Sequence, residues 1–286
     1  MMFSTLISAN ELSDLIDTEQ SDLVILDCRF NLMDTGLGAK LYAESHIPNA
    51  RYIDLDRELS APVTPETGRH PLPGFESLTA TFSEKGVSDR SQVVVYDDCG
   101  GAMASRCWWL LKLLGHKSVA LLDGGFPAWI AAGSGVTAAL PKNVPGDFSG
   151  TADTSMILPL DQVADFPQQG LLIDARTAER FRGEQEPIDP VAGHIPGALN
   201  RPLPDNLSAN GCFKSAEQLR IEWQLLLKGT AAAQVVHYCG SGVTACHNLL
   251  AMEHAGLTGA RIYPGSWSEW IRDTSRPIAT IDEKTA

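Results

Sequence analysis

The chain of 286 residues carries the same series of segments twice, once in each half. Each copy starts with an apolar run that ends in Asp-x-Arg, continues with His-Ile-Pro-x-Ala and a second apolar run, and closes on glycine and tryptophan residues. An internal repeat of domain length predicts two similar domains in tandem and constrains the fold more than any single motif. The segments of the first copy are 23–29, 46–50, 93–96 and 123–129, and those of the second are 171–176, 194–198, 235–238 and 263–270.

The two apolar runs of each copy are short and rich in Val, Ile and Leu, which is typical of strands that are buried on both faces. Helical patterns follow the second runs and stop at Gly115 and Gly256, as expected of glycines that terminate helices. Strands that alternate with helices predict an α/β fold in which each domain is a mainly parallel sheet flanked by helices. We expect the domains at residues 1–140 and 155–286, joined by a linker at 141–154 that shows no sustained periodicity.

The charge balance narrows the possible partners. The chain has 22 Lys and Arg against 35 Asp and Glu, a formal net charge of −13, which disfavours binding to nucleic acid or to anionic membrane surfaces. No apolar run approaches the roughly 18 residues of a membrane span, and residues 1–10 lack the pattern of a secretory leader, so we expect a cytoplasmic protein without a membrane partner. The six cysteines are spread over the chain without a Cys-x-x-Cys pair, which indicates reduced thiols.

The two copies differ in the loop that follows the second apolar run. Asp97 follows the run in the first copy, whereas Cys239 follows it in the second, at the start of the loop Cys-Gly-Ser-Gly-Val-Thr. α/β sheets bind ligands at the carboxyl ends of their strands, and a helix that begins there directs backbone N–H groups at the site. Such groups stabilise a thiolate and an anion bound beside it, while the two glycines let the backbone turn. The pattern indicates a nucleophilic cysteine.

Other interpretations of these residues stay open. A free cysteine is often simply buried in a core, which is the alternative for Cys239. His46 and His194 occupy equivalent places in both copies, including the one without the cysteine, which indicates a structural role. Cys99 lies in the loop of the first copy, where a redox role is conceivable. A Cys-dependent phosphatase normally carries an arginine where this chain has Ala245, and a binding or sulfur-relay module without catalysis forms a third class.

The His-Ile-Pro-x-Ala segments, the closing glycine and tryptophan residues and the Cys-Gly-Ser-Gly-Val-Thr loop together resemble the tandem-domain rhodanese-type sulfurtransferases over nearly the whole chain. The resemblance implies two rhodanese-like domains, of which the second carries the catalytic cysteine. It also implies a transfer in two steps, in which Cys239 takes sulfur from a small-molecule donor as a persulfide and a thiol acceptor such as thioredoxin, or cyanide, removes it. No metal or organic cofactor is implied.

The residues after Cys239 bear on the choice of donor. They are neutral, which resembles the branch of the family that uses 3-mercaptopyruvate and releases pyruvate, whereas the thiosulfate branch typically carries basic residues there. Arg180 matches the position that binds the donor's carboxylate in that branch. The second arginine of the branch has no counterpart, because residues 184–192 contain none and Ile188 lies about where we expect it. Thiosulfate is therefore the alternative donor.

The resemblance further implies a group that acts on the departing carbon of the donor. An Asp, His, Ser relay maps onto Asp56, His70 and Ser241, with Asp54 as the rival of Asp56. A surface histidine and an aspartate that caps a turn are the alternative interpretations of the first two residues. The catalytic residues expected on this basis are Cys239, Ser241, His70 and Asp56, and the expected substrate-binding residues are Arg180, Gly240, Gly242, Val243 and Thr244.

Overall fold

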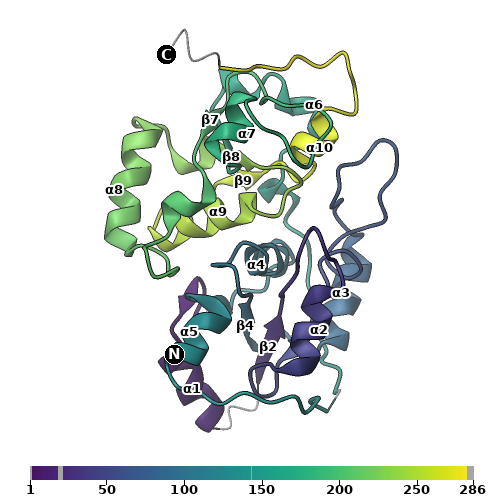
Figure 1. Cartoon of the computed structure of the whole chain (residues 1–286), viewed down its shortest axis with the longest axis vertical. Helices are drawn as coiled ribbons and strands as arrows, with labels where there is room; N and C mark the ends of the chain where they lie inside the picture. The colour runs from purple at the N-terminus through teal and green to yellow at the C-terminus, as the bar shows by residue number, and fades with distance from the viewer. Residues whose placement is uncertain (1, 19–21, 143, 282–286) are drawn as a thin grey trace. The chain divides into compact units, whose positions relative to one another are not determined.

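The computed structural model describes residues 2–18, 22–142 and 144–281, and the chain divides into two compact units (Figure 1). Unit 1 consists of Met1–Ala61, Pro73–Asp153 and Ser208–Phe213, and unit 2 of Pro62–Leu72, Thr154–Leu207 and Lys214–Ala286. Each unit thus includes one short segment from the other half of the sequence. The domain bounds expected from the sequence, 1–140 and 155–286 with a linker at 141–154, stay a prediction.

Unit 1 is a parallel sheet with helices packed around it. Its strands are β1 (Leu6–Ile7), β2 (Leu23–Asp27), β3 (Arg51–Tyr52), β4 (Gln92–Tyr96) and β5 (Val119–Leu122). They pair in the order β1-β5-β4-β2-β3. The helices are α1 (Ala9–Asp17), α2 (Leu37–Glu44), α3 (Phe75–Glu84), α4 (Ala104–Leu113) and α5 (Gly125–Ala131). In Figure 1, strands β2 and β4 lie between α1 and α5 on one side and α2 and α3 on the other.

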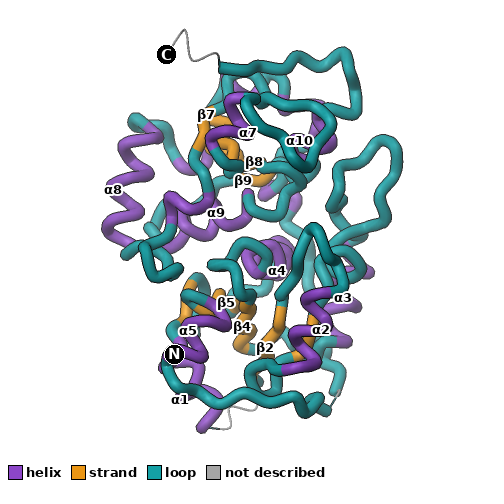
Figure 2. Tube along the Cα trace, in the orientation of Figure 1, coloured by secondary structure: helices purple, strands orange, loops and turns teal. Residues whose placement is uncertain are grey.

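Unit 2 repeats this plan. Its strands β6 (Leu171–Asp174), β7 (Leu199–Asn200), β8 (Val235–Tyr238) and β9 (Arg261–Ile262) form a parallel sheet in the order β7-β6-β8-β9. The α-helices are α6 (Leu160–Val163), α7 (Ala178–Arg182), α8 (Ala216–Leu227), α9 (Ala245–His254) and α10 (Ser266–Trp270), and short 3₁₀ helices lie at Thr154–Met156, Phe166–Gln168, Leu203–Asn206 and Ala232–Gln234 (Figure 2). Within the described part of the chain, no helix is long and apolar enough to cross a membrane.

The pattern of burial explains why the apolar runs become central strands. Every residue of β4 and of β8 is buried, which requires cover on both faces of the sheet. The predicted α/β fold with a parallel sheet in each half is therefore confirmed. Helices α4 and α9 both end just before the glycines expected to terminate them. Gly115 and Gly256 adopt left-handed φ angles of 84° and 77°, which is the backbone conformation that ends a helix.

The stretch expected to join the domains makes its own contacts with unit 1. The N–H of Gly146 donates to the carbonyl of Ser83 at 2.8 Å, and the N–H of Asp153 donates to the carbonyl of Leu113 at 2.7 Å. The ring of Phe148 is buried and packs edge-on against Phe82. Residues 144–153 thus pack on unit 1 along most of their length.

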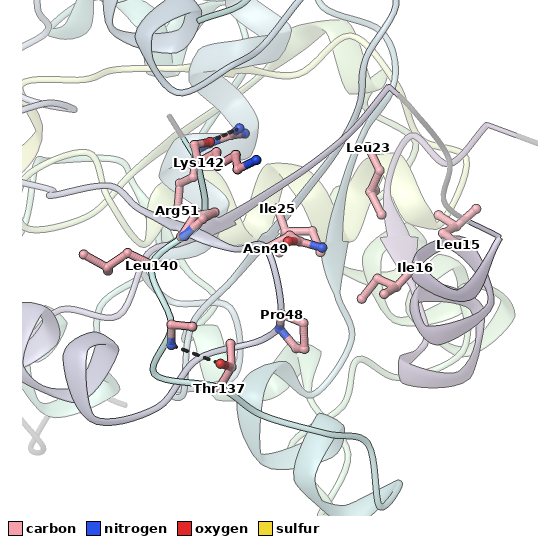
Figure 3. Close-up of a pocket in the computed structure, with 12 residues that line it drawn as sticks. Leu15, Ile16, Leu23, Ile25, Pro48, Asn49, Arg51, Thr137, Leu140 and Lys142 are labelled. Carbon is pink, nitrogen blue, oxygen red and sulfur yellow. Dashed lines mark hydrogen bonds between the residues drawn. The ribbon is translucent and has the colours of Figure 1, made fainter. Parts of the chain in front are cut away.

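A pocket of about 750 Å³ lies in unit 1, lined mainly by aliphatic side chains (Figure 3). Leu15, Ile25 and Leu140 contribute to its wall, and Arg51 and Lys142 are the charged residues among those that line it. None of the described lining residues is a cysteine, histidine or carboxylate. The described lining thus provides no thiol, imidazole or carboxylate, and the carboxyl ends of the strands are the place where α/β sheets usually bind ligands.

Candidate active site

Cys239 is the first residue after strand β8, and the loop 239–244 leads directly into helix α9. The side chain is buried, with 2% of the residue exposed. The N–H of Cys239 donates to Oγ of Ser266 at 3.1 Å, and its carbonyl accepts from the N–H of Trp267 at 2.9 Å. The start of α10 therefore holds the backbone of Cys239, which lies directly after the strand as predicted from the sequence.

Two backbone conformations fix the shape of this loop. Gly242 has a φ of 75°, and a Cβ atom there would lie 2.2 Å from the carbonyl oxygen of Pro264. Only glycine fits this position. Ser266 has a left-handed φ of 55°, which is rare for a residue with a side chain, and its Oγ donates to the carbonyl of Tyr263 at 3.0 Å. Unfavourable backbone geometry of this kind concentrates at functional sites.

Ser241 and His70 are in direct contact. Nδ1 of His70 lies 2.7 Å from Oγ of Ser241, and both residues are buried. His70 comes from the first half of the sequence, yet its segment Pro62–Leu72 belongs to unit 2. The segment is anchored there by the N–H of Arg69, which donates to Oγ of Ser268 at 3.0 Å, and by Nε of Arg272, which donates to the carbonyl of Thr67. The hydroxyl two residues after Cys239 thus has an imidazole partner.

Asp56 belongs to unit 1, in the turn that follows β3, and it is exposed. Partial desolvation and the neighbouring carboxylate of Asp54 raise the pKa of Asp56. Asp54, its rival in the sequence, accepts the backbone N–H groups of Asp56 and Arg57 at 2.9 and 3.0 Å and so stabilises the turn. The place of Asp56 in the relay stays a prediction.

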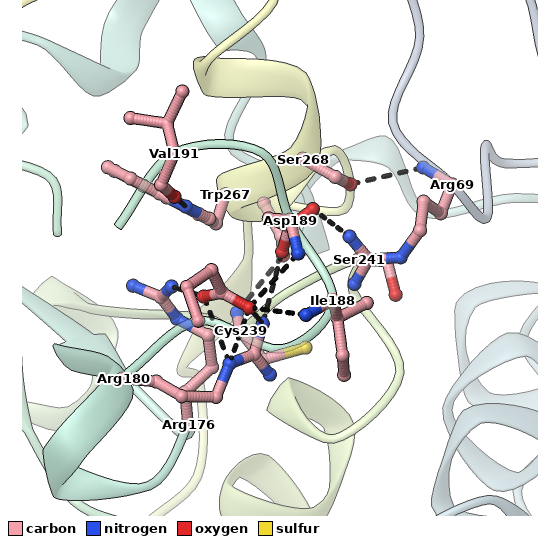
Figure 4. A network of polar contacts seen from close by, with 12 residues as sticks. Arg69, Arg176, Arg180, Ile188, Asp189, Val191, Cys239, Ser241, Trp267 and Ser268 are labelled. Atoms are coloured by element: carbon pink, nitrogen blue, oxygen red, sulfur yellow. Dashed lines mark hydrogen bonds and ion pairs between the residues drawn. The ribbon is translucent and has the colours of Figure 1, made fainter. Parts of the chain in front are cut away.

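A network of ion pairs surrounds Arg180 beside the loop (Figure 4). Nη2 of Arg180 donates to Glu186 at 2.7 Å and to Asp189 at 3.0 Å. Nη1 of Arg69 donates to the other oxygen of Asp189. Arg176 also pairs with Glu186. Two guanidinium groups from distant parts of the sequence, those of Arg69 and Arg180, are therefore joined by one carboxylate.

Burial decides the electrostatics of these carboxylates. It raises the pKa of Asp189 even though Arg69 and Arg180 act in the opposite direction. Burial also opposes ionisation of Glu186, but the hydrogen bonds from Arg180 and from backbone N–H groups outweigh it and lower the pKa of Glu186. The side chains of Glu186 and Asp189 are only 4% and 3% exposed, so water screens their ion pairs little.

Gly240 lies against both guanidinium groups. A Cβ atom at this position would be 2.7 Å from Nη2 of Arg69 and 3.5 Å from Nη2 of Arg180. The absence of a side chain thus lets the two cations approach the residue next to Cys239. Ile188, where the sequence leads us to expect the second arginine, is partly exposed and donates its N–H to Glu186. The second guanidinium group next to Gly240 is that of Arg69.

The remaining predicted residues belong to the same loop. Val243 is buried, and Thr244 is the residue that precedes the first turn of α9. Sequence reasoning missed Arg69, Glu186 and Asp189. They lie in polar segments without periodicity, and the one signal that could have found Arg69 is its position next to His70. In the described ranges, no cluster of His, Cys, Asp or Glu could hold a metal ion.

Comparisons with known proteins agree with this geometry. The sequence matches the family model described as "Rhodanese-like domain" at residues 8–132 and 160–273. It is 50% identical over 286 residues to the Pseudomonas aeruginosa protein named "Probable 3-mercaptopyruvate sulfurtransferase", covering 99% of this chain and 100% of that one. It is 32% identical to "Thiosulfate sulfurtransferase" of Mus musculus, covering 95% and 93% of the two chains. The structure resembles "3-mercaptopyruvate sulfurtransferase from Leishmania major" with a TM-score of 0.81 and 32% identity, covering 93% of this chain and 74% of that one.

Proposed function

The chain belongs to the family of proteins with rhodanese-like domains, and from this premise we propose that it is a sulfurtransferase that moves sulfur from 3-mercaptopyruvate to a thiol or to cyanide. The observation that carries the proposal is the surroundings of Cys239. The thiol follows a central strand directly, the hydroxyl of Ser241 is bonded to His70, and Gly240 lies against the guanidinium groups of Arg69 and Arg180. A nucleophile, a proton donor and a carboxylate site thus meet at one loop.

In the first step the Cys239 thiolate attacks the sulfur of 3-mercaptopyruvate. The bond between that sulfur and the adjoining methylene carbon breaks, and its electron pair goes to the carbon as the enolate of pyruvate. The sulfur, with its own hydrogen, stays on Cys239 as a persulfide. A proton then adds to the methylene carbon and pyruvate leaves. Dividing the transfer in this way predicts ping-pong kinetics.

Ser241 is the group that supplies this proton, and His70 reprotonates it through the bond between Nδ1 and Oγ. The buried position of both residues supports this role, because a proton shared inside the protein is not lost to bulk water. Asp56 is proposed as the third member of the relay on the strength of the family resemblance. The carboxylate of the donor binds at Arg180 and Arg69, beside the glycine-containing loop of Gly240, Gly242, Val243 and Thr244.

In the second step an acceptor attacks the outer sulfur of the persulfide and regenerates the Cys239 thiolate. A thiolate of a protein such as thioredoxin becomes a persulfide itself, and cyanide becomes thiocyanate. Both acceptors are nucleophiles that need no cofactor of this chain for the transfer. The location of the protein in the cytoplasm stays a prediction.

The test is a comparison of donors. We expect pyruvate release from 3-mercaptopyruvate in the presence of cyanide, and an adduct of about 32 Da on Cys239 in the absence of an acceptor. Cys239→Ser abolishes both, whereas Cys99→Ser in the other unit serves as the matched control and retains them. Absence of the adduct with any sulfur donor would contradict the proposal.

Ser241→Ala distinguishes the role of the relay from a purely structural one. We expect kcat with 3-mercaptopyruvate to fall by about a hundredfold, because the enolate is no longer protonated by the protein. Turnover of thiosulfate is expected to change much less, since sulfite leaves as a stable anion. An equal loss with both donors would show that Ser241 only shapes the loop.

Thiosulfate is the second candidate donor, favoured by the likeness to the mouse thiosulfate sulfurtransferase and by the lack of arginine in residues 184–192. Both donors are anions that two guanidinium groups can bind. A ratio of kcat/KM that clearly favours thiosulfate over 3-mercaptopyruvate would assign the protein to this activity instead.

A further inference from the structure

We propose that Asp189 is the positioning residue of a clamp for the donor's carboxylate: it fixes the guanidinium groups of Arg180 and Arg69 beside Gly240 and so sets the preference for donors that carry a carboxylate. The inference rests on the proposed function, because it concerns how the same site selects its donor. Asp189 acts on the donor through the two arginines, and it is not itself proposed to contact Cys239.

The carboxylate of Asp189 uses one oxygen for each arginine. Oδ2 accepts from Nη2 of Arg180 at 3.0 Å, and Oδ1 accepts from Nη1 of Arg69. The side chain of Asp189 is only 3% exposed, compared with 14% for Arg180 and 26% for Arg69. Charge-assisted hydrogen bonds shielded in this way are stronger and more directional than those on an open surface. One buried carboxylate thus ties an arginine of helix α7 to an arginine of the segment 62–72.

These residues are the end of a longer chain of alternating charges. Each interior member of the chain contacts an opposite charge on both sides, whereas Arg69 at its end pairs with Asp189 alone among the described residues. The Nε atom of Arg69 is moreover buried and has no hydrogen-bond partner in the described part of the chain. An anion bound next to Arg69 would continue the alternation. The chain runs through Asp174, Arg176, Glu186, Arg180, Asp189 and Arg69.

Asp189 holds the clamp without filling it. The atom of Arg69 that pairs with Asp189 is Nη1, whereas the atom that lies against Gly240 is Nη2. In Arg180, the hydrogen bonds to Glu186 and Asp189 use Nε and Nη2, and Nη1 is the further atom near Gly240, 3.7 Å from a Cβ atom at that position. Nη2 of Arg180, at 3.5 Å from that Cβ atom, is thus already bonded, whereas Nη1 of Arg180 and Nη2 of Arg69 take part in none of these bonds and are the groups we assign to an incoming carboxylate.

The dimensions of the donor fit this arrangement. Two carbon atoms separate the sulfur of 3-mercaptopyruvate from its carboxylate, a span similar to the roughly 3.8 Å between neighbouring Cα atoms. The donor is therefore long enough for its sulfur to meet Cys239 while its carboxylate lies at the neighbouring Gly240, next to both guanidinium groups. Thiol ketones without a carboxylate would gain nothing from the clamp.

The experiment compares 3-mercaptopyruvate with mercaptoacetone, which has a methyl group in place of the carboxylate. In Asp189→Asn one guanidinium loses its acceptor and its fixed position. We expect KM for 3-mercaptopyruvate to rise about tenfold while kcat changes by less than about twofold. The kinetics with mercaptoacetone are expected to stay the same. Asp189→Glu restores the carboxylate one methylene further out, so its KM should lie between those of the parent and the Asn variant.

Glu184→Gln is the matched control, because it removes an exposed carboxylate that pairs with Arg182 at the end of α7. An equal loss with both donors, an unchanged KM for 3-mercaptopyruvate, or a lower KM that would make Asp189 a competitor of the donor would each overturn the inference. If Asp189→Asn does not fold, the same donor comparison on Asp189→Glu decides. Failure of the proposed function is distinguishable, because it appears in the parent protein as a lack of pyruvate release.

Discussion

The loops after β4 and β8 share a scaffold and differ in what they enclose. In both, the carbonyl of the first loop residue accepts an N–H from the start of the last helix, from Phe126 to Asp97 at 2.8 Å and from Trp267 to Cys239 at 2.9 Å. In unit 1 the carboxylate of Asp97 then accepts backbone N–H groups of its own loop, at 2.8 to 3.0 Å. The loop of unit 1 thus encloses an anion that is part of the chain.

In unit 2 the residue at the same place is a thiol, and the ionic groups come from outside the loop. Arg69 and Arg180 lie against Gly240, whereas the charge of unit 1 is supplied by Asp97 within the loop. In the same loop, desolvation and the carboxylates of Asp97 and Asp98 raise the pKa of the Cys99 thiol, which disfavours its thiolate form. The strand, loop and helix of each unit thus provide a place for an anion. The first residue of the loop decides whether a side chain of the loop itself fills this place, as Asp97 does in unit 1.

The largest effect is expected from making the second loop like the first. Cys239→Asp removes the nucleophile and places a carboxylate where Asp97 stands in unit 1, so we expect sulfur transfer to fall by about a thousandfold or more. The loop N–H groups can then bind the new carboxylate, so the protein should keep its thermal stability. Kinetics with 3-mercaptopyruvate and a thermal unfolding scan check both parts. A marked drop in Tm would mean that the two loops are not equivalent.

A smaller effect is expected from disturbing the enclosed anion of unit 1. In Asp97→Asn an amide that donates hydrogen bonds faces the N–H groups of Met103 and Ala104, which leaves buried donors unpaired. We expect a loss of about 3 kcal/mol in the free energy of unfolding of unit 1 and faster amide exchange in its loop. Urea unfolding measures the loss of stability, and hydrogen exchange measures the change in the loop.

Asp98→Asn is the control for this prediction, because the neighbouring Asp98 is exposed and makes no comparable set of bonds in the described contacts. We expect it to change the stability by less than about 0.5 kcal/mol. Similar losses for the two variants would show that net charge, rather than the enclosed carboxylate, stabilises the loop.

The smallest effect concerns the strands beneath the loops. His237 in β8 occupies the place of Val95 in β4, and burial lowers the pKa of His237 to about 3. Because the unfolded chain binds a proton near pH 6.5 and the folded one does not, stability falls as the pH drops below about 6.5. In His237→Val the free energy of unfolding should decrease less steeply as the pH falls, by up to about 1.4 kcal/mol per pH unit. Urea unfolding between pH 7.5 and 5 tests it, and an unchanged slope would contradict it.

Much of this protein follows from short stretches of sequence. The repeat, the buried strands, the helix ends at Gly115 and Gly256 and the place of Cys239 depend on local apolar patterns and turn residues, which the chain expresses over a few neighbours. The family resemblance then pointed to Ser241 and His70, which the structure brings to 2.7 Å. Local apolar patterns, turn residues and the loop motif were sufficient for these predictions.

The tertiary structure decided what lies around the thiol. Arg69 and Asp189 stand in polar segments far apart in the sequence, and nothing in their local pattern says that they pair. Their meeting depends on where the segment 62–72 packs, and that follows from contacts such as the one between Arg69 and Ser268. Sequence alone therefore determined the α/β fold and the place of Cys239 after its strand, whereas the cluster of charges beside that loop arises only when distant residues are brought together and shielded from water.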